Sequence, residues 1–154
     1  MLITAMAIQV AVVGSGGEWE TSAEEVGRLL AGRGCTVVTG GLGEVMAAAH
    51  RGAKAVGGVT IAILPGESRR TANPWADHVV VTGVGHARNL AVAASGHAVI
   101  AVGGSYGTLA EIAFALRLGR PVVQLGNGPA VEGVIAVASP AEAVDRALEL
   151  LVTP

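Results

Sequence analysis

Short glycine-rich turns recur along this chain, and each follows a run of apolar residues. Four are evident: GSGG from Gly14, GGLG from Gly40, TGVG from Thr82 and GGSYGT from Gly103. A glycine-rich turn that opens a helix lets backbone N–H groups approach an anion closely, and the helix dipole favours negative charge at the same point. One such turn is equally consistent with a tight connection between a strand and a helix. Four of them at one edge of a sheet favour a ligand that carries a phosphate group.

The common nucleotide and cofactor motifs are not met. The first turn is not a dinucleotide fingerprint, because Trp19 stands where the third glycine would be and no acidic ribose ligand follows the second predicted strand. A P-loop needs Gly-Lys followed by Ser or Thr, but the only lysine, Lys54, is followed by Ala55. Lys54 is also predicted within a helix, so a pyridoxal-phosphate Schiff base is not expected. The four histidines are scattered, and we expect neither a metal site nor a resident cofactor.

Two charged residues are predicted near helix starts, close to the glycine turns. Arg88 follows the third turn, where its guanidinium could clamp a phosphate or hold a carboxylate. The plain alternative is a surface arginine, and a cation at that point opposes the helix dipole. Glu111 lies three residues after Thr108, which is also the spacing of a helix-capping box. The same pattern occurs at Thr21 and Glu24, where no function is suspected, so spacing alone does not single out Glu111.

The elements that must position these residues alternate between short β-branched runs and longer Ala-rich segments of helical spacing. Such alternation is typical of β-α-β units around a parallel sheet that is buried on both faces. We therefore predict an α/β fold, a Rossmann-like three-layer sandwich with six or seven parallel strands. The predicted strands are Gln9–Val13, Thr36–Thr39, Val59–Leu64, Val79–Thr82, Ala98–Val102 and Val122–Leu125, with a weaker seventh at Val134–Val137.

Five helices are predicted between the strands. The first is capped by Thr21 or Ser22 and ends at Gly32 or Gly34, and the last begins at the capping box formed by Ser139 and Glu142. The three between them cover Gly43–Val56, His86–Ser95 and Thr108–Leu118.

Composition narrows the class of protein. The 154 residues are 51% hydrophobic and 14% charged, which predicts a single domain over residues 1–154, with a core of small and β-branched side chains. Together with the glycine turns, this leads us to predict a nucleotide-binding domain. A net charge of −2 and the lack of any Lys/Arg run argue against nucleic-acid binding. No stretch approaches the roughly 18 apolar residues of a transmembrane helix, so no membrane partner is expected.

The N-terminus and the cysteine content bear on the compartment. Residues 1–13 are largely apolar but lack the positive charge that begins a signal peptide. We expect residues 1–7 to be a disordered extension, and Met1 and Met6 both stay open as the natural start. A single cysteine, Cys35, cannot form an internal disulfide, which favours a cytoplasmic protein.

Three segments of the chain resemble the LONELY GUY (LOG) superfamily, often labelled lysine decarboxylase-like. They are GGLGEVMAAAHRGAKAVGG from Gly40, TGVGHARNLAV from Thr82 and VGGSYGTLAEIA from Val102. The superfamily motifs are a G-G-x-x-G-x-M turn, an arginine-bearing helix start and G-G-x-x-G-T-x-x-E. With the first predicted strand and the AILP sequence at residues 62–65, the resemblance spans residues 10–125. It implies hydrolysis of the N-glycosidic bond of nucleoside 5′-monophosphates, which releases free base and ribose 5-phosphate.

The resemblance also assigns residues to that reaction. Glu111 would hold the ribose and stabilise the oxocarbenium-like charge, and Arg88 would be the second catalytic residue. The residues that it implies in phosphate and substrate binding are Gly14, Ser15, Gly40, Gly41, Gly103, Gly104, Ser105, Gly107 and Thr108.

The chain departs from the plant-type enzymes in ways that matter for activity. They have Lys where this chain has Asn89, and Pro where it has Val102, and they extend further at the C-terminus. A short bacterial branch and the molybdenum-cofactor carrier proteins are more similar, and those carriers bind a phosphorylated pterin without catalysis. The alternative to a phosphoribohydrolase is therefore a non-catalytic carrier of molybdenum cofactor or a nucleotide, which would need no ribose-directed Glu111. A purely structural oligomerisation module would leave the glycine turns unexplained.

Two further expectations concern partners. The helix predicted at Thr108–Leu118 is apolar on two faces, with Phe114 and Leu118 on the second, so we expect a homodimer. Trp75 lies in the polar loop between Pro65 and the fourth predicted strand. It could stack on a purine or pterin, although a loop aromatic more often packs against its own domain.

Overall fold

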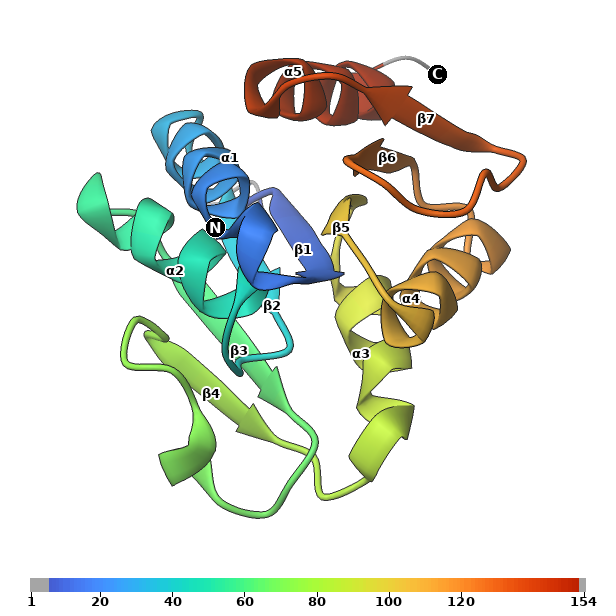
Figure 1. Cartoon of the computed structure of the whole chain (residues 1–154). Helices are drawn as coiled ribbons and strands as arrows, with labels where there is room; N and C mark the ends of the chain where they lie inside the picture. The colour runs from blue at the N-terminus through green and yellow to red at the C-terminus, as the bar shows by residue number, and fades with distance from the viewer. Residues whose placement is uncertain (1–5, 153–154) are drawn as a thin grey trace, which may run out of the picture.

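Seven parallel strands form one sheet in the computed structural model, which describes residues 6–152. The strand order is β4-β3-β2-β1-β5-β6-β7 (Figure 1). The strands are β1 (Gln9–Ser15), β2 (Thr36–Thr39), β3 (Thr60–Leu64), β4 (His78–Val81), β5 (Ala98–Gly103), β6 (Val122–Leu125) and β7 (Val134–Val137). The helices are α1 (Glu20–Gly32), α2 (Val45–Ala55), α3 (Arg88–Ser95), α4 (Tyr106–Arg117) and α5 (Pro140–Val152), with single 3-10 turns at Gly17–Trp19, Arg69–Thr71 and Gly85–Ala87. The predicted α/β fold is confirmed, and the weaker seventh strand is present.

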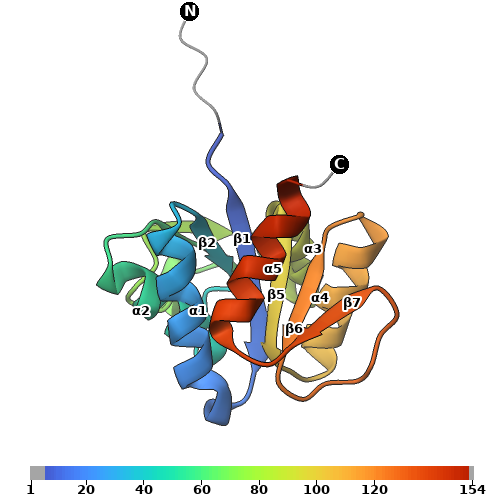
Figure 2. The ribbon, with the colours of Figure 1, turned by 90° about the horizontal axis from the view of Figure 1, so that it is seen from above.

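The sheet is covered on both faces (Figures 1 and 2). Helices α1, α2 and α5 pack on one face, where Val10 and Val12 of β1 are fully buried. Helices α3 and α4 pack on the other face, where the intervening Ala11 and Val13 are buried. Because successive side chains of a strand point to opposite faces, a central strand of this kind must be apolar throughout, and β1 is.

Two of the helix caps that the sequence suggests are not formed, and one of these differences matters for the site. Helix α1 continues from the 3-10 turn Gly17–Trp19 and begins at Glu20, so neither Thr21 nor Ser22 caps it. Helix α4 begins at Tyr106, and the N–H of Ser105 donates to Thr108 Oγ1 at 3.2 Å. Thr108 therefore belongs to the first turn of α4 and does not form a capping box with Glu111.

The last helix starts as the capping pattern predicts. The N–H of Glu142 donates to Ser139 Oγ at 3.1 Å, and the Glu142 carboxylate accepts from the N–H of Ala138 at 2.8 Å. Reciprocal bonds of this kind satisfy N–H groups that a helix start leaves unpaired.

Helices α1 and α2 approach each other so closely that their backbones touch. A β-carbon at Gly27 of α1 would lie 1.9 Å from the carbonyl oxygen of Ala49, and one at Gly52 of α2 would lie 1.9 Å from that of Glu24. Both glycines are therefore fixed by packing rather than by turn geometry. This contact joins the middle parts of α1 and α2, and each helix follows one of the glycine turns.

Two expectations concern the chain's ends and its relation to membranes. The extension expected over residues 1–7 falls mostly on residues 1–5, which lie outside the described residues. Across residues 6–152, no helix is long and apolar enough to cross a membrane.

The outer face of the α3–α4 layer is apolar. Phe114 of α4 is 36% exposed, Leu118 directly after α4 is 42% exposed, and Leu90 of α3 is 43% exposed. The second apolar stripe expected on this helix is thus at the surface, as a homodimer contact requires, and the dimer itself stays a prediction.

We expect Gly27→Ala to lower the free energy of unfolding by about 1–3 kcal/mol, since the added methyl group meets backbone that cannot rotate away. Gly32→Ala is the matched control, because a β-carbon there meets nothing within 4 Å and the residue still lies in α1. Urea unfolding followed by circular dichroism measures both, and equal effects of the two substitutions would contradict the packing account.

Sedimentation velocity at micromolar concentration should give twice the mass of one chain, and Phe114→Asp should give a monomer because it places a charge in the apolar contact. Val56→Asp is the control, since Val56 is 47% exposed at the end of α2 in the opposite layer. A monomeric wild-type protein would end the dimer hypothesis.

Candidate functional site

The candidate site lies where the strand order reverses. From β1 the chain proceeds outward through β2, β3 and β4 on one side and through β5, β6 and β7 on the other. In open α/β sheets the crevice beyond the carboxyl ends of the strands at this point is where ligands bind. A pocket of about 180 Å³ occupies it here. Its lining residues are Val12, Val13, Gly14, Ser15, Gly40, Met46, His86, Arg88, Asn89, Ser105, Gly107, Thr108 and Glu111.

Most of the residues predicted from the sequence meet in this pocket. Arg88 and Glu111, which are 23 positions apart in the chain, both line it, as do residues of three glycine turns. The predicted residues that line the pocket are Gly14, Ser15, Gly40, Arg88, Ser105, Gly107, Thr108 and Glu111.

Gly41, Gly103 and Gly104 lie outside the pocket lining, and their neighbours explain the difference. A β-carbon at Gly103 would lie 2.3 Å from Cδ1 of Trp19, so this glycine makes room for an indole ring. Gly41 packs in the same way on Ala62, and Gly104 lies beside a neighbouring pocket. Glycines needed for packing and glycines that face a ligand look alike in a sequence.

Arg88 is the first residue of α3, and its side chain turns inward rather than toward solvent. The residue is only 8% exposed, and Nη1 donates to Asn89 Oδ1 at 2.7 Å. The guanidinium lies against Gly40, where a β-carbon would come within 2.4 Å of Nη1. Its Nε–H is buried with no acceptor among residues 6–152. A buried, unsatisfied donor on a permanently charged group is the feature expected of a site that receives an oxyanion.

Glu111 faces the same pocket from the second turn of α4. It is 8% exposed, and its burial raises the pKa of the carboxyl to about 7, while the charge of Arg88 acts in the opposite direction. Burial likewise lowers the pKa of Arg88, and the charge of Glu111 raises it. Near neutral pH, Glu111 therefore divides its population between a carboxylate and a neutral acid, which can donate a hydrogen bond.

Arg88 also borders a second pocket, of about 320 Å³. That pocket is lined by Leu42, Pro65, Gly85, His86, Arg88 and Asn89. Five residues that line the first pocket were not predicted as site residues: Val12, Val13, Met46, His86 and Asn89. Asn89 adjoins Arg88 in the chain, and Met46 lies in the first turn of α2. Both carry a signal in the sequence, because Met46 occupies the last position of the G-G-x-x-G-x-M motif and Asn89 is one of the departures from the plant-type enzymes.

Glu44 is a strained residue at the edge of the site. It has φ 53°, a left-handed conformation that glycine adopts easily and glutamate does not. In the G-G-x-x-G-x-M pattern this position is the third glycine. The Glu44 carboxylate accepts a hydrogen bond from the N–H of Gly16 at 3.0 Å, which ties the second glycine turn to the first. This contact offsets part of the cost of the backbone conformation, about 1–3 kcal/mol for such residues.

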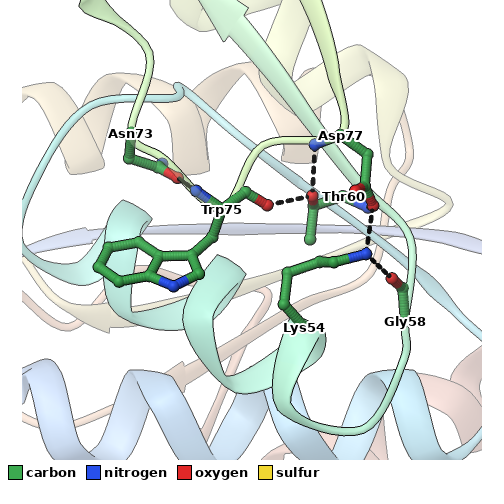
Figure 3. A network of polar contacts seen from close by, with 6 residues as sticks. All are labelled: Lys54, Gly58, Thr60, Asn73, Trp75 and Asp77. Atoms are coloured by element: carbon green, nitrogen blue, oxygen red, sulfur yellow. Dashed lines mark hydrogen bonds and ion pairs between the residues drawn. The ribbon is translucent and has the colours of Figure 1, made fainter.

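Trp75 is held away from the pocket. The Cζ atom of Arg51 lies 5.1 Å from the centre of the Trp75 ring, and the backbone oxygen of Trp75 accepts from Thr60 Oγ1 at 2.6 Å. Figure 3 shows Trp75 within a network in which Lys54 Nζ donates to Asp77 Oδ2 at 2.9 Å. The ring thus packs against α2, the second of the two alternatives open from the sequence, and lines neither of the pockets beside Arg88.

The first pocket combines three chemical capacities. Backbone N–H groups at the start of α4 can receive a phosphate, the Arg88 guanidinium supplies a fixed positive charge, and Glu111 can accept or donate a proton. Among residues 6–152 no group of three or more His, Cys, Asp or Glu side chains has an arrangement that could hold a metal ion. The arrangement favours an anionic ligand with a polar group beside its phosphate.

Comparison with known proteins identifies the family that the chain matches. Residues 7–148 match the SLOG cluster4 family. An uncharacterised protein of Archaeoglobus fulgidus is 42% identical over 141 residues, which is 90% of this chain and 93% of that protein.

Three solved structures share the fold. The molybdenum cofactor binding protein from Rippkaea orientalis is 31% identical with a TM-score of 0.89, over 97% of this chain and 100% of that one. The molybdenum cofactor carrier protein from Chlamydomonas reinhardtii is 34% identical with a TM-score of 0.88, over 96% and 100%. DNA processing protein A from Streptococcus pneumoniae is 25% identical with a TM-score of 0.71, over 90% of this chain and 61% of that one.

Glu111→Gln should stabilise the protein at alkaline pH. The pKa of Glu111 in the folded protein is about 7 against an ordinary 4.5, so the free energy of unfolding falls as the pH rises through that interval. Glutamine keeps the shape without ionising, so the variant should exceed the wild type by about 3 kcal/mol at pH 8 and by little at pH 4.5. Urea unfolding at both pH values tests this. Glu132→Gln, which removes an exposed carboxyl, is the control, and a pH-independent gap for Glu111→Gln would contradict the assignment.

Proposed function

This chain belongs to the SLOG cluster4 family, and we propose that it is a carrier that binds a small phosphorylated heterocycle, of the molybdenum-cofactor class, in the pocket between Arg88 and the start of α4. The observation that carries the proposal is the buried Arg88 guanidinium, whose Nε–H has no acceptor among the described residues. Burial without full hydrogen bonding costs about 1–3 kcal/mol for a polar group, and more for a charged one. A bound phosphate oxygen would remove that cost.

The start of α4 is the second part of the phosphate site. Ser105, Gly107 and Thr108 line the pocket at the N-terminus of a helix of 12 residues. The first N–H groups of a helix have no partner within the helix, and they carry the positive end of its dipole. Arg88 and this helix start belong to different elements and face one cavity, so an anion between them contacts both.

Two features support a carrier rather than an enzyme. Proteins described as binding or carrying molybdenum cofactor match this chain along almost its whole length, at 31% and 34% identity. In addition, a carboxyl with a pKa of about 7 is in part a neutral acid at physiological pH, and a neutral acid can hydrogen-bond to a phosphate oxygen where a carboxylate would repel it. Glu111 then serves ligand binding directly.

A phosphoribohydrolase of the LOG type is the second candidate, and Glu111 is the observation that favours it. A carboxylate beside the ribose can stabilise the oxocarbenium-like state of N-glycoside cleavage. That role needs the ionised form, so hydrolysis would rise as the pH passes through 7. The affinity for a dianionic phosphate beside Glu111 would instead fall as the pH passes through 7, because ionised Glu111 repels the phosphate.

Nucleic acid stays outside the proposal. The shared fold is sufficient to explain the similarity to DNA processing protein A. The net charge of −2 does not favour a broad basic surface that could bind a phosphate backbone. A short single-stranded oligonucleotide belongs in any ligand panel as a competitor.

The test is equilibrium binding of anaerobically released molybdenum cofactor, measured by retention on the protein after rapid gel filtration, with a nucleoside 5′-monophosphate panel in parallel. Wild-type protein should retain the cofactor, and Arg88→Met should lose at least about tenfold in affinity, the scale of one charge-assisted hydrogen bond. Arg117→Met, which removes an exposed arginine of α4, should bind as wild type does.

The same samples separate the two candidates. Chromatography of the nucleotide incubations detects released base and ribose 5-phosphate, and release that Glu111→Gln abolishes would establish the hydrolase and displace the carrier. Retention of cofactor without any release supports the carrier, whereas the absence of both binding and release would refute both functions.

A further inference from the structure

The turn that follows β2 sets the position of the Arg88 guanidinium. Gly40 lies directly against that guanidinium, where a β-carbon would come within 2.4 Å of Nη1, and Leu42 lines the second pocket beside Arg88. A shift of the Gly40–Leu42 turn would therefore move both the support of the arginine and a wall of the neighbouring pocket. What holds this turn is relevant to ligand binding.

The turn is held by two side chains and one backbone N–H group, none of which pairs it with a strand. The N–H of Gly41 donates to Thr39 Oγ1 at 3.0 Å. The backbone N–H of Asn73 donates to the carbonyl of Gly41 at 2.8 Å, and Asn73 Nδ2 donates to the carbonyl of Leu42 at 3.2 Å. Thr39 therefore hydrogen-bonds to one side of the turn, and Asn73, from the loop between β3 and β4, hydrogen-bonds to the other.

Both of these side chains contact one histidine. His50 lies in α2 and is fully buried. Its Nε2 is 3.1 Å from Thr39 Oγ1, and its Nδ1 is 3.2 Å from Asn73 Nδ2. His50 therefore contacts both side chains that hold the turn, although it lines neither pocket beside Arg88.

The hydrogen-bond partners fix the protonation of His50. Asn73 Oδ1 accepts from the N–H of Trp75 at 3.0 Å, and Asn73 Nδ2 donates to the carbonyl of Leu42, so the amide cannot be flipped without losing both bonds. The amide nitrogen Nδ2 can only donate hydrogen bonds. His50 Nδ1 must therefore accept a hydrogen bond from it, and the ring proton must be on Nε2. Burial agrees with this, because it lowers the pKa of His50 to about 4 and keeps the ring neutral.

We propose that His50 is a positioning residue of the ligand site: as the neutral Nε2–H tautomer it joins Thr39 to Asn73 and thereby holds the Gly40–Leu42 turn against Arg88. The inference rests on the proposed function, because the position of Arg88 matters only if its guanidinium binds the anionic group of the ligand. It adds a residue that touches no ligand and still determines affinity.

The chain supplies a control residue that anchors the same loop from β3. Thr60 is also fully buried, and its hydroxyl donates to the backbone oxygen of Trp75 at 2.6 Å and accepts from the N–H of Asp77 at 2.9 Å (Figure 3). Thr60→Val removes this second anchor of the β3–β4 loop but removes none of the hydrogen bonds to the Gly40–Leu42 turn. Loss of general stability and loss of positioning can therefore be separated.

The test is a titration with inorganic phosphate, followed by two-dimensional NMR on the amides of Gly107 and Thr108 and on the Arg88 Nε–H. We expect His50→Leu and Asn73→Ala each to weaken phosphate binding by about tenfold and to shift the Arg88 Nε–H signal, and Thr60→Val to leave both unchanged. If His50→Leu does not fold, the phosphate affinity of Asn73→Ala alone is compared with those of Thr60→Val and the wild type. His50→Gln, which keeps a donor near the Nε2 position, should recover part of the affinity.

A measurement on the unmodified protein tests the tautomer directly. Long-range nitrogen–hydrogen correlations should show His50 neutral with the proton on Nε2 at pH 7. A proton on Nδ1, or wild-type affinity in both His50→Leu and Asn73→Ala, would overturn the inference and leave the proposed carrier standing. If wild-type protein binds neither phosphate nor the released cofactor, the proposed function fails, and this inference fails with it.

Discussion

The burial of one guanidinium is the constraint on which the site depends. Arg88 is 8% exposed at the point where the strand order reverses, and a charge removed from water needs nearby partners. The protein meets this need incompletely: Asn89 accepts from one nitrogen, Glu111 shares the pocket, and Nε–H has no acceptor among residues 6–152. A fully satisfied arginine would serve structure alone. An incompletely satisfied one beside a helix N-terminus is prepared for an anion.

The surrounding elements can be understood as supports for that arginine. The parallel sheet brings the ends of β1, β2 and β5 to one edge, so that the turns after them reach the same cavity. Close contact of α1 and α2 at Gly27 and Gly52 sets these two helices against each other. The Glu44 carboxylate then links their turns, at the cost of a strained backbone. Rigid support of this kind suits a site that must hold a ligand without reorganising.

The loop between β3 and β4 contributes through its anchors rather than through its aromatic residue. One anchor is Asn73, which reaches the Gly40–Leu42 turn, and the other is the network of Lys54, Thr60 and Asp77 (Figure 3). Trp75 packs against Arg51 between them. The polar β3–β4 loop thus supports the site through its hydrogen bonds. Trp75, which could have stacked on a ligand, has a structural role.

The sequence by itself determined the strands, the parallel α/β class and the pairing of glycine turns with Arg88 and Glu111, because hydrophobic periodicity and turn chemistry are local properties of the chain. It could not sort the glycines, since Gly103 is explained by Trp19, Gly27 by Ala49 and Gly40 by Arg88, each distant in the sequence. It also indicated neither the raised pKa of Glu111 nor any role for His50. Burial and long-range hydrogen bonds decide that one carboxyl has a pKa of about 7 and that one histidine is a neutral bridge. Those environments exist only once the elements have packed together.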